Sequence, residues 1–291
     1  MIQDIGPRHL FNEYHEGKPE EDDTCFLFRD GQILALSGEE NRMDYPRYRD
    51  FSEEDRKKFH FVYLLRVDDR KCFLAVGRNL PEEAQFTLPS GFSFFPVNIF
   101  RKARPKYMAF AAVTAWHLNV WYRNNQFCGR CGKRMSPDHR ERMMRCSCGN
   151  LVYPRISPAV IVAITDGNRI LLTKYAAGSY HHYALVAGFT EIGETLEQTV
   201  EREVMEEVGL KVKNIRYYKS QPWGLSGSLL AGFFCDLDGD DTITLQEDEL
   251  KEAEWFEAAD LTPEADGISL TREMMAKFRV DHTGGQKLTT V

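Results

Sequence analysis

The segment from Gly188 to Leu210, GFTEIGETLEQTVEREVMEEVGL, constrains this chain of 291 residues more than any other part. Residues Thr195–Val208 have the pattern of an amphipathic helix, and a glycine follows to end it. Because residues three and four apart share a helix face, Glu203, Glu206 and Glu207 converge on one stripe. Like charges there repel unless cations neutralise them, and Mg²⁺ and Mn²⁺ prefer carboxylate ligands. The segment predicts a divalent-metal site; the alternative is a solvated acidic helix face.

The same segment resembles the Nudix box, Gly-x5-Glu-x7-Arg-Glu-U-x-Glu-Glu-x-Gly-U, where U is aliphatic, and matches it at every fixed position. The resemblance implies hydrolysis of a nucleoside diphosphate linked to another group. It also implies that Glu203, Glu206 and Glu207 bind the catalytic Mg²⁺ or Mn²⁺, which would polarise a phosphorus and activate an attacking water. Arg202 is expected to pair with Glu194.

Four cysteines form a second cluster. Cys128 and Cys131 are followed, after fourteen residues, by Cys146 and Cys148. Thiolates suit tetrahedral zinc, and four of them leave no open position, so the spacing predicts a zinc ribbon with a structural Zn²⁺. Two alternatives stay open: the thiols are unrelated, or His139 replaces one of them as a ligand.

The residues after the box indicate a subfamily. Ser220–Ser228, SQPWGLSGS, resembles the NADH pyrophosphatase signature Ser-Gln-Pro-Trp-Pro-Phe-Pro-x-Ser and departs from it at residues 224–226. A zinc ribbon directly before the Nudix domain is typical of this subfamily, although its second cysteine pair is usually one residue longer. The resemblance covers residues 116–278. It implies hydrolysis of NADH or NAD⁺ to nicotinamide mononucleotide and AMP, NAD-capped RNA as a second substrate, and a homodimer.

The resemblance also implies substrate-binding residues. Phe189 and Tyr153 would stack on a base, and Gln221 and Ser228 would hydrogen-bond the substrate. The alternative for the two rings is core packing.

Glu249 matches the position of a further metal-binding glutamate. Glu247 and Glu252 compete for that role, and an exposed acidic loop is the alternative for all three.

The chain is expected to be an α+β protein. The period of the apolar residues predicts hairpins over 25–36 and 60–76, a helix over 104–124, and a further hairpin with strands at 159–164 and 169–173. Strands at 183–187, 229–237 and 254–256 and a closing helix over 269–278 complete the pattern. These elements predict a β-rich N-terminal domain that ends in a helix, a small zinc ribbon, a C-terminal Nudix α/β/α sandwich and a flexible tail, over residues 1–123, 124–152, 153–282 and 283–291.

Charge and hydropathy narrow the function. With 37 Lys and Arg against 44 Asp and Glu, the net charge of -7 argues against a general nucleic-acid binder but not against a nucleotide held through metals. No stretch is apolar enough to span a membrane, and residues 1–20 lack the core of a secretion signal, so we expect a cytoplasmic protein without membrane contact. Two alternatives stay open: another Nudix specificity, such as ADP-ribose or a dinucleoside polyphosphate, and a non-enzymatic nucleotide sensor or RNA-binding module.

Overall fold

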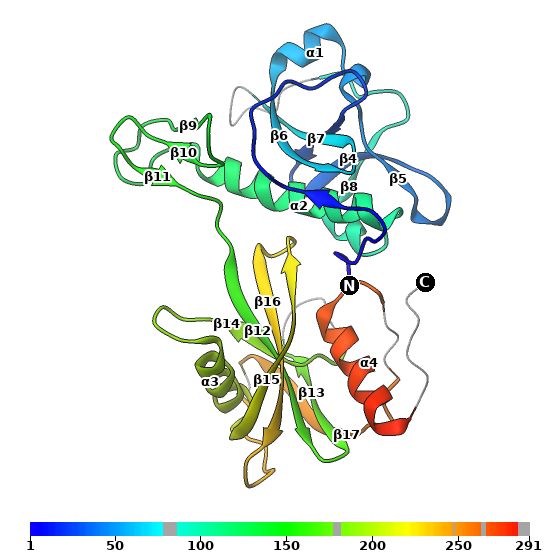
Figure 1. The fold of residues 1–291 in the computed structure, drawn as a ribbon, viewed down its shortest axis with the longest axis vertical. Helices are drawn as coiled ribbons and strands as arrows, with labels where there is room; N and C mark the ends of the chain where they lie inside the picture. The colour runs from blue at the N-terminus through cyan, green and yellow to red at the C-terminus, as the bar shows by residue number, and fades with distance from the viewer. Residues whose placement is uncertain (78–85, 177–181, 247, 263–265, 285–291) are drawn as a thin grey trace. The chain divides into compact units, whose positions relative to one another are not determined.

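The computed structural model describes residues 1–77, 86–176, 182–246, 248–262 and 266–284. They form two compact units (Figure 1). The first comprises Ile2–Arg155 with Gly224–Ser226, and the second comprises Met1, Ile156–Trp223 and Gly227–Val291. Both units combine sheets with few helices, which confirms the α+β class. No helix among the described residues is long and apolar enough to cross a membrane.

The first unit contains two mixed or antiparallel sheets beside one long helix, and a small three-stranded sheet near its end. Its strands are β1 (Leu10–Phe11), β2 (Thr24–Phe26), β3 (Phe28–Arg29), β4 (Gln32–Ser37), β5 (Met43–Asp44), β6 (Phe59–Val67), β7 (Arg70–Gly77), β8 (Ser93–Pro96), β9 (Ser136–Pro137), β10 (Met144–Arg145) and β11 (Leu151–Val152). Its helices are α1 (Glu53–Lys58) and α2 (Lys106–Asn124), with 3-10 turns at Glu39–Asn41, Tyr48–Asp50 and Val97–Arg101.

Both predicted N-terminal hairpins are present. Strands β3 and β4 pair around Asp30 and Gly31, which take the left-handed backbone that such a turn requires. Strands β6 and β7 pair in antiparallel fashion up to Val67 and Arg70. The predicted helix is α2, and it buries Trp121 among its apolar residues, as core packing requires.

The second unit is a six-stranded sheet between two helices, with strand order β15-β16-β12-β13-β17 and β14 beside β12. Figure 1 shows α3 and α4 on opposite sides of this sheet. Its elements are β12 (Ser157–Asp166), β13 (Arg169–Tyr175), β14 (Val186–Phe189), α3 (Leu196–Val208), β15 (Val212–Trp223), β16 (Ser228–Leu237), β17 (Leu250–Glu257) and α4 (Leu270–Thr283).

Alternation along β12 explains the sandwich. Val160 and Val162 belong to the core cluster that includes the buried valines of α3. Ile161 and Ala163 belong to the cluster that includes Leu270 and other residues of α4. Because successive side chains of a strand point to opposite faces, this apolar run is buried on both sides, which confirms the predicted α/β/α layering.

Three expectations for the second unit need correction. The longest strand, β15, is absent from the sequence prediction because most of its residues are at least partly exposed and its apolar residues do not alternate. Helix α4 continues to Thr283 rather than ending at Phe278, and it ends where Gly284 takes a left-handed backbone. The predicted strand over 183–187 begins later, as β14. Of the predicted flexible tail, residues 285–291 lie outside the described part of the chain.

Candidate active site and metal centres

The acidic helix α3 is fixed at both ends by local hydrogen bonds. At its start, Thr195 Oγ1 accepts from the backbone N–H of Gln198 (3.2 Å), and Gln198 Oε1 accepts from the backbone N–H of Thr195 (2.9 Å). This reciprocal pair is a capping box. At its end, Gly209 has φ 71° and donates to the carbonyl of Met205. The predicted helix and its glycine cap are confirmed, and they set which face each glutamate occupies.

The three glutamates of α3 differ in exposure. Glu203 and Glu207 are only 8 % and 2 % exposed, whereas the side chain of Glu206 is 52 % exposed. Val204 and Val208 are fully buried in the core beneath the helix. Two carboxylates of the stripe therefore lie inside the fold and one at its rim, which an ordinary solvated acidic face would not show.

Arg202 binds three carboxylates at once. Its guanidinium donates to both carboxylate oxygens of Glu194 (2.6 and 3.0 Å), to Glu203 Oε1 (2.7 Å) and to Glu206 Oε2 (2.9 Å). It also donates to the backbone carbonyl of Phe189 (2.8 Å), which ties the loop to the helix. These bonds hold the pKa of Glu194 at about 2. The predicted Arg202–Glu194 pair is present and forms part of a wider clamp.

A hydroxyl that sequence reasoning missed completes this clamp. Thr199 is fully buried, and its Oγ1 lies 2.9 Å from Glu194 Oε2. Its position one turn into the helix, facing the loop glutamate, is the signal that could have identified it.

Close backbone packing explains the first glycine of the segment. A Cβ atom built at Gly188 would lie 1.9 Å from the carboxylate carbon of Glu203. No larger residue fits there unless Glu203 moves, so this glycine lets the strand approach the carboxylate directly.

The buried carboxylates are electrostatically frustrated without a cation. Burial raises the pKa of Glu207 to about 8, and the charges of Glu203 and Glu249 add to the effect. Burial also raises the pKa of Glu203. Among the described residues, Glu207 Oε2 has no hydrogen-bond partner although it is buried. An orphaned carboxylate oxygen of this kind costs about 1–3 kcal/mol. A divalent cation would supply the missing partner, and the hard oxygen donors fit Mg²⁺ or Mn²⁺.

The chain segment after β16 brings a fourth glutamate to this cluster. The backbone N–H of Gln246 donates to the carbonyl of Glu207 (3.0 Å), and the N–H of Glu249 donates to the carbonyl of Gln246 (3.0 Å). Glu249 is exposed. Its competitor Glu252 instead pairs with Lys174 Nζ at 2.5 Å. Glu247, the other competitor, lies outside the described residues. The contacts favour Glu249 over Glu252 as the additional ligand.

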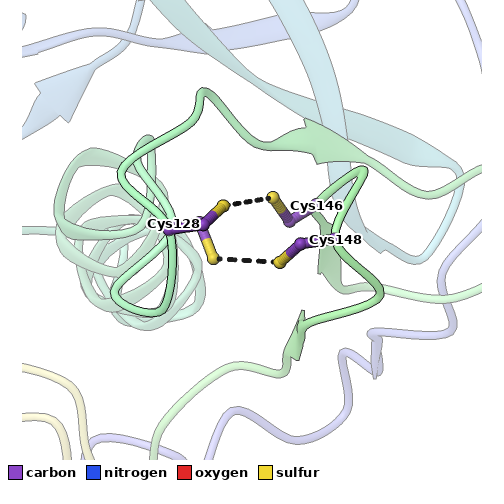
Figure 2. A group of neighbouring side chains, drawn as sticks. Cys128, Cys146 and Cys148 are labelled. Carbon is purple, nitrogen blue, oxygen red and sulfur yellow. Dashed lines mark hydrogen bonds between the residues drawn. The ribbon is translucent and has the colours of Figure 1, made fainter.

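The four cysteines form a compact cluster. Their sulfur atoms all lie within 4.8 Å of one another, and no other group of three or more ligand residues in the described ranges is this compact. Cys128 Sγ lies 3.7 Å from Cys148 Sγ (Figure 2). Cys131 Sγ lies 3.5 Å from Cys146 Sγ. Four sulfurs placed about 2.3 Å from one zinc would be separated by about 3.8 Å. The donor set and spacing therefore fit a tetrahedral Zn²⁺.

Two further observations argue against the two alternatives to a four-cysteine zinc site, which are unrelated thiols and His139 as a ligand. Cys128 Sγ accepts hydrogen bonds from the backbone N–H of Arg130 and from Asn150 Nδ2, both at 3.4 Å, as expected of a sulfur that carries negative charge. His139, considered above as a replacement ligand, lies instead 2.6 Å from a carboxylate oxygen of Glu16.

The predicted stacking residues are both on the surface. Phe189 is 56 % exposed at the end of β14, and Tyr153 is 53 % exposed, so the core-packing alternative is wrong for both. Tyr153 donates through its hydroxyl to Glu141 Oε2 (2.8 Å). The two rings belong to different compact units, and their joint stacking on a base stays a prediction.

The predicted substrate-binding pair is buried. Gln221 is fully buried in β15, where its Nε2 donates to the carbonyl of Ile268 (2.7 Å) and its Oε1 accepts from the N–H of Leu270 (2.8 Å). Ser228 is 2 % exposed at the start of β16. Gln221 thus anchors the first turn of α4. The missed strand β15 explains why its burial was not foreseen, and substrate contact by either side chain stays a prediction.

Comparisons with known proteins agree with this geometry. The model of the NUDIX domain matches residues 155–278, and the model of the NADH pyrophosphatase zinc ribbon domain matches residues 123–153. The chain contains a Nudix domain. Its acidic helix and clamp lie within the matched range, and all four cysteines lie within the matched ribbon.

Curated relatives match about half of the chain. An "NAD-capped RNA hydrolase NudC" of Actinobacillus succinogenes is 45 % identical over 155 residues, which are 50 % of this chain and 58 % of that protein. A protein of the same name from an Enterobacter strain is 43 % identical over 170 residues, covering 57 % of this chain and 66 % of that protein. The chain thus spans less than two thirds of either relative. A Nudix hydrolase structure from Nitrosomonas europaea is 22 % identical, with a TM-score of 0.46, over 56 % of this chain and 96 % of that one.

Proposed function

We propose that this protein is a metal-dependent pyrophosphohydrolase that cleaves NADH or NAD⁺ to nicotinamide mononucleotide and AMP. The observation that carries the proposal is the pair of buried glutamates on α3, one of which has an orphaned carboxylate oxygen. A fold that buries two like charges side by side gains from a divalent cation, and such cations are what a diphosphate needs in order to approach an acidic surface.

In this proposal, Glu203 and Glu207 bind the metal from inside the domain, and Glu206 and Glu249 bind it from the rim. Mg²⁺ or Mn²⁺ would supply Lewis-acid polarisation of a phosphoryl oxygen and a water of lowered pKa. Arg202 orients the cluster through Glu194, Glu203 and Glu206 and limits their mutual repulsion.

Two independent features support a dinucleotide substrate. The ribbon resembles that of NADH pyrophosphatases, and the matched relatives are named as hydrolases of NAD-capped RNA. An NAD cap presents the same diphosphate as free NAD⁺, so we propose that this protein also removes NAD caps from RNA. Phe189 and Tyr153, both exposed, are proposed to stack on a base of the dinucleotide.

The remaining proposals concern the state of the protein. We propose one structural Zn²⁺ on the four cysteines, supported by their sulfur spacing. The unpaired thiols suit a reducing compartment, so we propose a cytoplasmic location. We also propose a homodimer, on the basis of the subfamily resemblance alone.

Product analysis tests the activity. The protein is incubated with NADH, NAD⁺ or ADP-ribose in Mg²⁺ or Mn²⁺, and nicotinamide mononucleotide and AMP are quantified. Glu207→Gln keeps the size of the buried side chain and removes its charge, so turnover should fall about a thousandfold. Glu201→Gln, a matched change at an exposed position of the same helix, should leave the rate unchanged.

Two outcomes would contradict the proposal. Preferential turnover of ADP-ribose would replace the substrate while keeping the metal site. Equal activity of Glu207→Gln and Glu201→Gln would instead remove the metal role of the buried cluster.

A further inference from the structure

The charge of this chain is unevenly distributed. Residues 123–153 contain seven Lys and Arg against two Asp and Glu, a formal net charge of +5, whereas the other residues together carry -12. Four thiolates around one Zn²⁺ would add two negative charges and still leave the ribbon positive. The ribbon is therefore a cationic module in an acidic protein.

Most of these cations face solvent without a counter-ion. Arg123, Arg130, Lys133 and Arg140 are exposed, and none forms an ion pair with any residue in the described ranges. Arg145 differs because it pairs with Asp138 at 3.0 Å. Four like charges on so small a module repel one another and raise the concentration of anions around it.

An aromatic side chain lies among these cations. Phe127 is 61 % exposed, directly before the first cysteine, and forms an isolated antiparallel bridge with Arg134. The backbone N–H of Cys128 donates to the carbonyl of Lys133 (2.8 Å), which closes the turn that carries Arg130. We call Phe127, Arg130, Lys133 and Arg134 the knuckle surface.

The ribbon is also held firmly on the β-rich domain of its own unit. Arg142 is half-buried, and its guanidinium donates to the backbone carbonyls of Asn12 (3.2 Å) and Leu64 and lies 5.6 Å from the centre of the Tyr14 ring. Tyr14 donates through its hydroxyl to the carbonyl of Asp138 (2.9 Å). These contacts fix the ribbon on the β-rich domain, so the backbone of the ribbon loses little conformational entropy when a ligand binds.

We propose that the knuckle surface binds single-stranded RNA. Exposed cations beside an exposed aromatic ring are the elements that bind such strands, since the cations neutralise phosphates and the ring stacks on a base. The inference rests on the proposed function. It adds that the ribbon contributes to the binding of capped RNA but not to the binding of the free dinucleotide.

The test compares two triple variants. The knuckle variant neutralises the knuckle surface through three changes, Arg130→Gln, Lys133→Gln and Arg134→Gln. The control variant makes the same charge change at three exposed positions of the same unit outside the ribbon, Lys57→Gln, Arg70→Gln and Lys102→Gln. Zinc content and thermal midpoint verify that both variants fold. Initial rates are then measured on NADH and on a short unstructured RNA with a 5′ NAD cap, and binding of the uncapped RNA is measured against salt concentration.

The knuckle variant should raise KM for capped RNA about tenfold, leave NADH hydrolysis unchanged, and reduce the slope of log affinity against log salt by about 2 for three lost phosphate contacts. Phe127→Ser should weaken RNA binding about tenfold without changing that slope, because stacking is not electrostatic. Tyr217→Ser, at another exposed aromatic residue, should change neither quantity.

Equal effects of the two triple variants on capped RNA would overturn the inference, and so would unchanged capped-RNA kinetics in the knuckle variant. If the unaltered protein hydrolysed neither NADH nor capped RNA, the proposed function would be overturned instead. In that case, binding of the uncapped RNA still tests the knuckle surface. If the unaltered protein bound an acidic protein through the knuckle surface but did not bind the uncapped RNA, the inference would also be overturned.

Discussion

The two clusters of ligand residues solve the problem of holding a metal in opposite ways. The cysteine cluster has its four sulfur atoms already within 4.8 Å of one another, and the main chain around them donates hydrogen bonds to sulfur. The glutamate cluster is looser: Arg202 binds Glu203 and Glu206, while Glu207 keeps an unpartnered buried oxygen. Of the two, only the cysteine set has the geometry of a closed coordination sphere.

This difference corresponds to different chemical tasks. A closed thiolate tetrahedron leaves no position for a substrate, so its contribution is to folding. A set of carboxylates partly neutralised by an arginine can exchange ions and share them with phosphate oxygens. We therefore expect changes at the first cluster to alter stability, and changes at the second to alter activity in a protein that stays folded.

The largest expected effect is on the ribbon. Cys131→Ser removes one of four thiolates, and structural zinc contributes about 10–16 kcal/mol of apparent binding free energy in small zinc modules. The variant should lose zinc by elemental analysis, and amide exchange should become fast from residue 128 to residue 152. Cys235→Ala, a change at a buried thiol of the Nudix core, should keep its zinc. Full zinc occupancy in Cys131→Ser would show that the compact cluster is not the metal site.

The second prediction makes one chemical change in both clusters. In Gly188→Ala, the new Cβ would meet the Glu203 carboxylate carbon at 1.9 Å and displace this proposed ligand, whereas a Cβ at Gly129 would meet nothing within 4 Å. Misplacing a catalytic group by about 1 Å can cost about a hundredfold in rate. We therefore expect kcat of Gly188→Ala to fall by about a hundredfold, with little change in zinc content. Gly129→Ala should keep both zinc and activity. Similar kcat values for the two variants would mean that Glu203 tolerates displacement and that its position does not limit catalysis.

The features that could be predicted from the sequence are those set by nearby residues. The span of α3 follows from its capping residues and Gly209, the double burial of β12 follows from its continuous apolar run, and the zinc ribbon follows from the density of cysteines. The Arg202–Glu194 pair was also predicted from the box, and it is present.

The features that were missed depend on contacts between distant segments. Nothing near Gln221 in the sequence indicates that its amide binds the backbone around Ile268, 47 residues away. The ion pair that occupies Glu252 likewise depends on Lys174, 78 residues away, whereas the metal role predicted for Glu249 stays a prediction. Strand β15 is mostly exposed at the edge of the sheet, so the pattern of apolar residues that identifies buried strands is weak there.

The smallest expected effect concerns His139, which lies close to the cysteines in sequence and could have been a ligand. A hydrogen bond with Glu16 raises the pKa of His139 above its ordinary value, although both side chains are exposed. Because the folded-state pKa is the higher one, this pair stabilises the protein below the unfolded-state pKa of about 6.5, and the contribution disappears as pH rises through the folded-state pKa. Glu16→Gln should lower the His139 pKa, measured by NMR titration of its ring protons, and should leave zinc content unchanged. His139→Ala should also retain the full zinc content. If His139 were a zinc ligand, the metal would suppress protonation of its ring, and His139→Ala would release the ion. A ring that does not titrate, or loss of zinc from His139→Ala, would therefore show that only three of the cysteines bind the metal.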